Sequence, residues 1–378
     1  MHLMPTPANP WLPALLPLLV AALLAAGSVP LVRWLSFRVG AVAIPGSRRI
    51  HDRPTGRLGG LSLCLGFSAA VAIFGRGIPN WGPIVGIGVA VTALLALDDR
   101  LDLPYWTKLV LQLGCSLVVA AGFGVLITTV HLPGGVVRLG WLAIPLTVIW
   151  LMGMQNSINL LDGVDGLAAG VVAIVAGILL VAAVDRLSID MNQSGVILLC
   201  AALVGACLGF LLFNFAPAKI FMGDSGSHFL GLMVGIITIV GVAKVTAGLA
   251  LVVPVAALGL PITDTAFAIV RRQRAGRSFA EADTRHLHHR LLARGLSVRE
   301  TAVAFYLVTA ILGCIGLAIF GHRTILATAM VLLAVSLGLL GWRVRRRGPA
   351  DGAVPVPGPV AAPSRASELP DRSRRAGR

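Results

Sequence analysis

The sequence has little charge. Asp, Glu, Lys and Arg make up 12% of its 378 residues, and hydrophobic residues make up 57%, whereas a soluble domain typically carries about 25% charge. This leaves too little polar surface to cover the two or three soluble domains that the length would suggest. Apolar runs of membrane-spanning length recur along the chain, and they are continuous, which argues against the alternating strands of an outer-membrane barrel. We therefore expect an all-α fold, a polytopic membrane helical bundle.

The N-terminal segment lacks positive charge, and the cysteines lack a motif. No Lys or Arg occurs before the first apolar run, so the positive region of a signal peptide is missing and we interpret the run as a membrane anchor. The five cysteines lie inside apolar segments without metal-binding or redox spacing. We interpret them as small residues of the core.

The apolar runs predict about eleven transmembrane helices. We expect them at residues 11–35, 58–75, 82–97, 108–130, 138–155, 167–184, 194–213, 228–243, 247–270, 301–320 and 324–342. Of the 31 Lys and Arg residues, 26 fall on one side of this arrangement or in the C-terminal tail, and 5 fall on the other side. Because cytoplasmic connections carry the excess of positive charge, we expect the N-terminus outside and the C-terminus in the cytoplasm of a multi-pass inner (plasma) membrane protein.

Composition also divides the chain and excludes one class of partner. Residues 1–347 are expected to form the membrane-embedded domain, and residues 348–378, rich in Gly, Pro, Ala, Ser and Arg, a disordered cytoplasmic tail. The net charge of +15 is spread over the connections and this tail, where it orients helices and contacts anionic lipid. We expect the bilayer as a partner and no nucleic acid.

Acidic residues gather on the predicted cytoplasmic side. Of the 16 acidic residues, 11 lie in or beside its connections, 3 lie in the tail, and only Asp185 and Asp190 lie on the opposite side. Acidic residues do not follow the positive-inside rule, so topology does not require this gathering. An ionisable residue beside a membrane span is costly and by default indicates function. The pattern predicts an active site at the cytoplasmic membrane surface.

The first polar connection contains the adjacent pair Asp98 and Asp99, followed by Lys108. Adjacent carboxylates repel each other, and a cation is the simplest way to hold them together. Mg²⁺ usually binds one or two carboxylates together with substrate phosphates. The alternative is a solvated loop with helix-capping aspartates.

The second polar connection carries amides and carboxylates at intervals of three, namely Asn156, Asn159, Asp162 and Asp165. In a helix each neighbouring pair would share a face, while the glycines of this segment would equally allow a turn close to a ligand. Such groups bind sugar hydroxyls, a nucleobase or a metal. A polar re-entrant turn without a ligand is the alternative.

The third connection ends in Gly223-Asp224-Ser225-Gly226-Ser227, directly before an apolar run. Its backbone N–H groups and hydroxyls suit a phosphate or a hydrated metal. Asp224 would otherwise only cap the next helix.

The fourth connection contains Arg285-His286-Leu287-His288-His289-Arg290. Three histidines are compatible with a metal site. No Cys lies nearby, and arginines stand on both sides, which favours contact with a phosphate or a uridine diphosphate. A plain loop is the third alternative.

Taken together, these motifs resemble the polyprenyl-phosphate N-acetylhexosamine-1-phosphate transferase family, within glycosyltransferase family 4. The resemblance covers most of residues 45–300. It rests on five parts in the expected order: His51 with Gly59-Gly60, Asp98-Asp99 with Lys108, Asn159-Leu160-Leu161-Asp162-Gly163-Val164-Asp165-Gly166, Phe221-Met222-Gly223-Asp224-Ser225-Gly226-Ser227, and His286-Leu287-His288-His289. The combination is specific, whereas each part alone is weak.

Eleven spans and a His-Leu-His-His motif, in place of three consecutive histidines, are similar to the branch that uses UDP-N-acetylglucosamine. One departure stands out. Ala43-Ile44-Pro45 occupies a loop where that branch often carries an Asp two residues before the proline, so we assign no role there.

The resemblance implies a Mg²⁺-dependent phosphoglycosyl transferase, with Mn²⁺ as an alternative metal. It would transfer N-acetylglucosamine-1-phosphate from UDP-N-acetylglucosamine to undecaprenyl or decaprenyl phosphate and release UMP, the first membrane step of a cell-envelope polysaccharide. The implied catalytic residues are Asp98, Asp99, Lys108 and Asp224, and the three aspartates are also the implied metal ligands. The implied substrate-binding residues are Asn159, Asp162, Asp165, Arg285, His286, His288, His289 and Arg290. The division of base and metal roles between Asp98 and Asp99 stays open, as does a homodimer.

Three rival functions fit the sequence less well. Within the family, the alternative is the phospho-N-acetylmuramoyl-pentapeptide transferase of peptidoglycan synthesis. A membrane transporter or flippase would place its polar residues near the bilayer midplane, whereas here only Asp264 lies deep inside a predicted span. An intramembrane aspartyl protease would need paired aspartates deep in two facing spans, and Asp98 and Asp224 lie too near the predicted surface.

Overall fold

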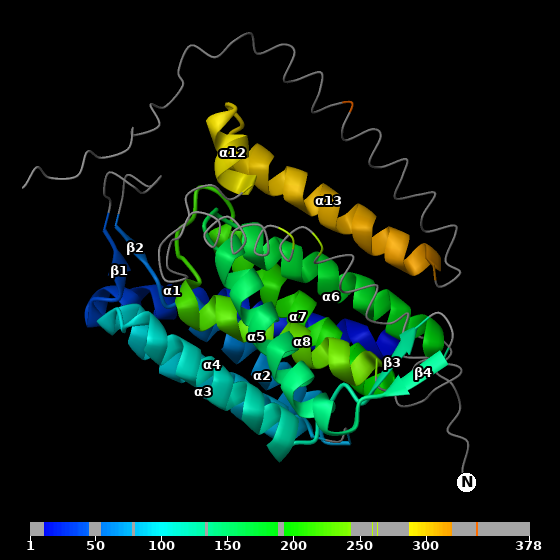
Figure 1. Cartoon of the computed structure of the whole chain (residues 1–378). Helices are drawn as coiled ribbons and strands as arrows, with labels where there is room; N and C mark the ends of the chain where they lie inside the picture. The colour runs from blue at the N-terminus through cyan, green and yellow to red at the C-terminus, as the bar shows by residue number, and fades with distance from the viewer. Residues whose placement is uncertain are drawn as a thin grey trace, which may run out of the picture.

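The computed structural model describes residues 11–44, 54–77, 80–132, 135–187, 193–242 and 287–319, together with Gly259, Thr263 and Gly338. In this part of the chain, eight helices are long and apolar enough to cross a membrane, and the shorter apolar helix Gly60–Phe74 accompanies them. The protein is an all-α polytopic membrane protein (Figure 1).

The elements follow one another in a simple order. They are α1 (Leu12–Val39), β1 (Val42–Ala43), β2 (Thr55–Gly56), α2 (Gly60–Phe74), α3 (Trp81–Leu101), α4 (Tyr105–Leu117) with the π-helical turn Val118–Gly122, β3 (Thr129–Leu132), β4 (Gly135–Arg138), the 3₁₀ turn Gly140–Leu142, α5 (Ala143–Leu161), α6 (Leu167–Arg186), α7 (Gln193–Asn214), α8 (Gly223–Val242), α12 (Leu287–Ala293) and α13 (Val298–Ile319). Two antiparallel hairpins, β1–β2 and β3–β4, lie at opposite ends of the bundle (Figure 1).

Helix α8 lies at the centre of the bundle. It packs against α2, α3, α5, α6 and α7, while α1 covers α2 and α7, and α13 covers α6 (Figure 1). Most side chains of α8 are buried, whereas α1 exposes a row of leucines that includes Leu15, Leu19 and Leu23. Exposed leucines on a spanning helix suit contact with lipid.

Small residues bring helices α1 and α7 into backbone contact. A Cβ atom on Gly205 would lie 2.1 Å from the carbonyl oxygen of Leu18, and one on Gly209 would lie 2.2 Å from that of Ala22. Because lipid is as apolar as a leucine side chain, helices in a membrane associate through such close packing rather than through the hydrophobic effect. The two glycines, one helical turn apart, therefore form the seam between α7 and α1.

Nine of the eleven expected spans coincide with helices α1 to α8 and α13. The expected spans 247–270 and 324–342 lie outside the described residues, apart from Gly259, Thr263 and Gly338. The total of eleven, the orientation of the termini and the tail at 348–378 stay predictions.

The boundaries of three expected spans are wrong. The helix expected at 108–130 ends at Gly122, and Thr129–Leu132 forms β3, because Gly124 adopts a positive φ of 65° that ends helical geometry. The helix expected at 138–155 runs instead from Ala143 to Leu161, and the one expected at 228–243 begins at Gly223. Both shifts matter, because they place polar motifs on helices rather than in loops.

Candidate active site

The N-terminus of α8 is held by the buried carboxylate of Asp99. One oxygen of Asp99, Oδ1, accepts a hydrogen bond from the backbone N–H of Asp224 at 2.8 Å. The other, Oδ2, accepts from the backbone N–H of Ser225 at 3.1 Å and from its hydroxyl at 2.7 Å. The first N–H groups of a helix have no partner within the helix, and a carboxylate there is favourable. Asp99 therefore anchors the helix end that carries Asp224.

Glycines allow the chain to close around this helix end. Gly223 has a positive φ of 69°, and a Cβ atom on it would lie 2.4 Å from Asp99 Oδ2. Gly59 and Gly60 donate backbone hydrogen bonds of 2.9 Å to the carbonyls of Phe221 and Met222. The Gly-Gly pair of the sequence motif thus joins the start of α2 to the loop before α8.

Lys108 joins the other two aspartates. Its ammonium lies 2.7 Å from Asp98 Oδ2 and 2.5 Å from Asp224 Oδ2. The Asp98 side chain is 1% exposed and the Asp224 side chain is 19% exposed, so only the latter is accessible from the end of the bundle. The other Asp98 oxygen, Oδ1, accepts from the backbone N–H of Leu103 at 2.8 Å and so fixes the turn between α3 and α4.

Asn159 completes the surroundings of Asp224. Its amide nitrogen donates to Asp224 Oδ1 and to the hydroxyl of Ser227, both at 2.9 Å. Asn159 lies in the last turn of α5, so the segment that the sequence left open between helix and turn is helical up to Leu161. The structure therefore brings together five predicted site residues from α3, α4, α5 and α8, namely Asp98, Asp99, Lys108, Asn159 and Asp224.

Arg57 belongs to this site, although the sequence assigned it no role. Its guanidinium lies 3.2 Å from Asp102 Oδ1 and 3.7 Å from Asp99 Oδ1. Burial lowers the pKa of Arg57, but the carboxylates of Asp99, Asp102 and Asp224 more than offset this and raise it. In the sequence, only its position close to Gly59-Gly60 distinguishes Arg57. Many other arginines lie in polar connections, so position alone did not identify it as a site residue.

Asp162 and Asp165 differ in their surroundings. Asp165 is buried, and its Oδ2 accepts a hydrogen bond of 2.8 Å from the backbone N–H of Ala218, which ties the α5–α6 loop to the α7–α8 loop. Burial raises the pKa of Asp162 well above its usual value, and the negative charges of Asp224, Asp99 and Asp165 raise it further. The site therefore concentrates negative charge that a cation would relieve.

The histidine connection is only partly described. Arg285, His286 and the His51 of the first motif lie outside the described residues. His288 and His289 belong to α12, and Arg290 on the same helix is exposed. Their predicted contact with substrate stays a prediction.

Helix α13, which follows α12, is tied to the site loops. Arg299 Nε donates to the carbonyl of Ala216 at 2.7 Å, and the hydroxyl of Tyr306 donates to the carbonyl of Gly166 at 2.6 Å. Gly170 leaves the space that the Tyr306 ring occupies. The α12–α13 unit is therefore anchored to the loops on both sides of α6 and α7.

The residues present fit a divalent cation held by few protein ligands. Oxygens of Asp98 and Asp224 converge on one point, where the Lys108 ammonium lies, and they are the hard donors that Mg²⁺ prefers. Across the described ranges, no three His, Cys, Asp or Glu side chains are grouped as a ready metal site. One oxygen each of Asp98 and Asp224 pairs with the Lys108 ammonium, which a metal ion can replace, whereas both oxygens of Asp99 hold the backbone N–H groups of Asp224 and Ser225. The fit is therefore best for Asp224 and Asp98, with substrate phosphates as the remaining ligands.

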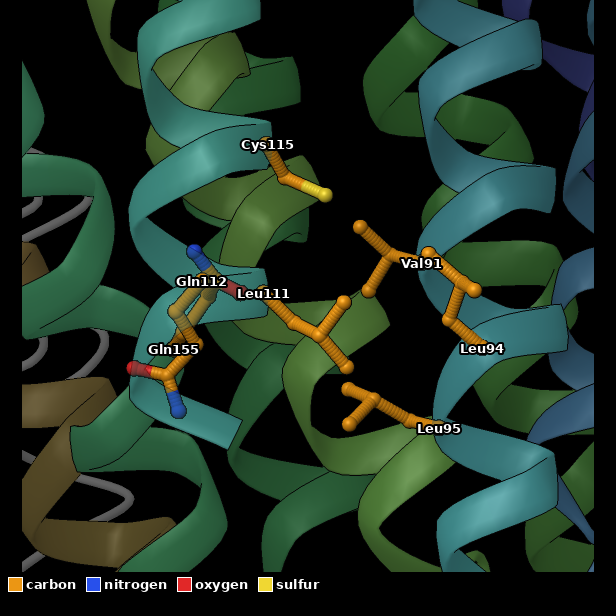
Figure 2. Close-up of a pocket in the computed structure, with 7 residues that line it drawn as sticks. All are labelled: Val91, Leu94, Leu95, Leu111, Gln112, Cys115 and Gln155. Atoms are coloured by element: carbon orange, nitrogen blue, oxygen red, sulfur yellow. The ribbon is translucent and has the colours of Figure 1, made fainter. Parts of the chain in front are cut away.

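A narrow apolar pocket lies between α3 and α4 (Figure 2). It is lined by Val91, Leu94, Leu95, Leu111, Gln112, Cys115 and Gln155. Leu94 lies one turn from Asp98 on α3, and Gln112 lies one turn from Lys108 on α4, so the pocket begins one helical turn from the charged cluster. Its polar lining consists of two glutamines.

Comparison with known proteins supports the assignment that the motifs suggested. Residues 82–242, which include Asp98, Lys108, Asn159 and Asp224, match the family model for glycosyl transferase family 4. A probable undecaprenyl-phosphate N-acetylglucosaminyl 1-phosphate transferase of Bacillus subtilis is 36% identical over 74% of this chain and 77% of its own length. The chain belongs to glycosyl transferase family 4. The predicted family is therefore confirmed.

Relatives of both branches of the family are similar to this member. The decaprenyl-phosphate N-acetylglucosaminephosphotransferase of Mycolicibacterium smegmatis is 35% identical, over 89% of each chain. A phospho-N-acetylmuramoyl-pentapeptide-transferase of Synechococcus is 34% identical, over 80% of this chain and 89% of its own. The relatives that match at 35–36% are named for N-acetylglucosamine, as the resemblance to that branch predicted.

Proposed function

We propose that this family member transfers N-acetylglucosamine-1-phosphate from UDP-N-acetylglucosamine to undecaprenyl or decaprenyl phosphate. The proposal is supported by the names of the Bacillus and Mycolicibacterium relatives. The structural observation that carries it is the Lys108 ammonium between Asp98 and Asp224, at one end of an apolar bundle. A charged cluster at the membrane surface suits a reaction between a lipid phosphate and a water-soluble nucleotide.

The chemistry requires positioning and charge neutralisation. An oxygen of the lipid phosphate attacks the β-phosphorus of the UDP-sugar, the bond from that phosphorus to the bridging oxygen breaks, and UMP leaves with the bridging oxygen. Lys108 supplies a positive charge for the phosphates, and Asn159 holds Asp224 in one orientation. In phosphoryl transfer such electrostatic stabilisation provides most of the catalysis.

We propose Mg²⁺ as the cofactor, held by Asp224 and Asp98, with Asp99 as a further predicted contact. When bound, it would neutralise charge that develops on the diphosphate. Asp98 and Asp99 are alternatively candidates for the base that keeps the lipid phosphate deprotonated. Because the second pKa of a phosphomonoester is about 6, much of that phosphate is already dianionic near neutral pH. A base therefore contributes less to the rate than a metal ligand does.

The remaining predicted residues would bind the nucleotide and the sugar. Asn159, Asp162 and Asp165 would contact the nucleotide, and Arg285, His286, His288, His289 and Arg290 would contact the diphosphate or the sugar. The site would face the cytoplasm of the inner (plasma) membrane, as the distribution of basic residues predicts. A homodimer stays a prediction.

The test is product identification with the purified full chain. The protein in detergent is incubated with Mg²⁺, undecaprenyl or decaprenyl phosphate, and UDP-N-acetylglucosamine with UDP-N-acetylmuramoyl-pentapeptide at equal concentration. Mass spectrometry of the lipid fraction should show a polyprenyl diphosphate carrying N-acetylglucosamine. A muramoyl-pentapeptide product as the main species would overturn the choice of sugar, and no lipid-linked product from any UDP-sugar would overturn the proposed function.

A further inference from the structure

A second polar layer lies one helical turn beneath the Lys108–Asp224 pair. It consists of Gln112 on α4, Asn156 on α5 and His228 on α8. Gln112 and His228 are 3% and 2% exposed. Gln112 follows Lys108 and His228 follows Asp224 by four positions. Asn156 precedes Asn159 by three, so each residue of the layer lies on the same helix face as its site residue. The helices thus meet twice, first through Lys108, Asn159 and Asp224, and then through this layer.

The three side chains form one continuous chain of hydrogen bonds. Asn156 Nδ2 donates to Gln112 Oε1 at 2.7 Å and to the carbonyl of Met152 at 2.8 Å. Gln112 Nε2 and His228 Nε2 are 2.7 Å apart, and His228 Nδ1 lies 2.9 Å from the carbonyl of Asp224. These contacts join α5 to α4 and α4 to α8.

The backbone carbonyls at the two ends of this hydrogen-bond chain decide which group donates in each contact. A carbonyl only accepts, so Met152 requires the Asn156 amide nitrogen, and Asp224 requires a proton on His228 Nδ1. Gln112 must then accept from Asn156 with its oxygen and donate to the bare Nε2 of His228. Each of these four contacts then pairs a donor with an acceptor, so the layer has one self-consistent arrangement.

We propose that Gln112, Asn156 and His228 are positioning residues that set the register of α4, α5 and α8, so that Lys108, Asn159 and Asp224 meet in reactive geometry. None of the three need touch substrate. Within an apolar bundle their polar groups have no water to bond, so they can be satisfied only when the helices are in register. A misplacement of about 1 Å at reacting groups can cost about a hundredfold in rate.

The proposal rests on the proposed transferase activity, and its main test is kinetic. His228→Phe and Gln112→Leu keep most of the side-chain volume and remove the hydrogen bonds. We expect each variant to lower kcat by about tenfold or more, with KM for both substrates within about twofold. The double variant should lose no more than the worse single variant, because the layer acts as a unit.

A conservative variant separates positioning from loss of packing. In His228→Gln, the amide nitrogen could donate to the carbonyl of Asp224, as Gln155 does to Leu151 at 3.4 Å, and its oxygen could accept from Gln112. This variant should keep kcat within about threefold of the parent. If kcat of His228→Gln falls as far as that of His228→Phe, while its thermal midpoint matches the parent, the hydrogen-bond role is overturned. Full kcat in both His228→Phe and Gln112→Leu would also overturn it.

Gln155 provides a matched control. It is a buried glutamine beside Gln112 on the same pocket (Figure 2), and it bonds to Ser116 at 3.3 Å. Among the residues that the structure describes, its Oε1 has no hydrogen-bond partner and its side chain makes no hydrogen bond to the layer. Gln155→Leu should therefore leave kcat near that of the parent. A tenfold fall in this control would show that any buried glutamine produces the effect and would overturn the specific proposal.

A spectroscopic measurement separates failure of this inference from failure of the proposed function. With ¹⁵N-labelled histidine, the His228 ring signals, assigned by their loss in His228→Phe, should show a protonated Nδ1 and a bare Nε2. They should shift in Gln112→Leu and stay unchanged in Gln155→Leu. A proton on Nε2, or no shift of the His228 signals in Gln112→Leu, would overturn the proposed hydrogen-bonded layer even if the enzyme is active. An inactive parent protein that shows the expected signals would overturn only the transferase assignment.

Discussion

Lys108 and Asp224 lie 116 positions apart in the chain, yet the ammonium of the first donates to the carboxylate of the second. The contact joins the first turn of α4 to the first turn of α8, with Asp98 on the other side of the ammonium. Two carboxylates share one cation here, so removal of Lys108 would leave two neighbouring carboxylates without their cation, whereas removal of one aspartate leaves the ammonium paired with the other.

Asp224→Asn should lower turnover by at least about a hundredfold, because it removes the accessible carboxylate of the cluster. The amide still accepts from Asn159, so the fold should survive, and the thermal midpoint serves as the check. Asp185→Asn, at the exposed far end of α6, is the matched control and should leave turnover unchanged. Near-normal turnover in Asp224→Asn would remove this residue from the site.

Metal removal should abolish activity. The converging oxygens of Asp98 and Asp224 suit a hard divalent cation, so treatment with EDTA should stop product formation, Mg²⁺ should restore it and Mn²⁺ should restore it in part. Initial rates against metal concentration are the measurement. Full activity in EDTA would contradict the cofactor assignment.

Asp99→Asn should destabilise the protein as well as slow it. An amide nitrogen in place of Oδ2 would face the N–H and hydroxyl donors of Ser225, so hydrogen bonds to a buried charge are lost, at a cost of about 2 kcal/mol. We expect a lower thermal midpoint in detergent. Asp102→Asn provides the contrast, because the Asp102 side chain is 82% exposed and the Asp99 side chain is 0% exposed. Equal midpoints for the two variants would argue against the anchoring role.

Gly60→Ala should prevent correct assembly of the α2–α8 contact. Its Cβ atom would lie 2.2 Å from the backbone nitrogen of Gly226, and backbone cannot move aside as a flexible side chain can. Yield of folded protein on size exclusion and turnover should both fall. Gly86→Ala on α3 meets nothing within 4 Å and should be tolerated, with a gain of about 0.5 kcal/mol from helix propensity. A fully active Gly60→Ala would show that the helices separate at little cost.

The orientation of the chain can be read with reporters. A reporter fused after Gly348 should be cytoplasmic, and one inserted near Asp190 should be external, because most basic residues lie in the connections on the side of the C-terminal tail. An external signal from the C-terminal fusion would make ten spans the better number.

Most helices could be predicted from the sequence, because a bilayer sets the length of an apolar run. The family could be predicted as well, because its motifs are local runs of residues. The sequence alone presents Asp98 and Asp99 as an equivalent pair. The structure separates them, since successive residues on a helix point about 100° apart. Asp98 faces Lys108, and Asp99 faces the backbone before Ser225.

Composition and local order are enough to establish that the chain spans a membrane, where its polar connections lie and which family it resembles. Which polar side chains meet follows from the packing of the helices. Gln112 is a single polar residue in an apolar run, whereas Asn156 and His228 belong to polar motifs, and whether the three meet depends on the rotation of three helices about their axes. That rotation is set by packing between segments 44 to 116 positions apart in the chain, and no local pattern records it.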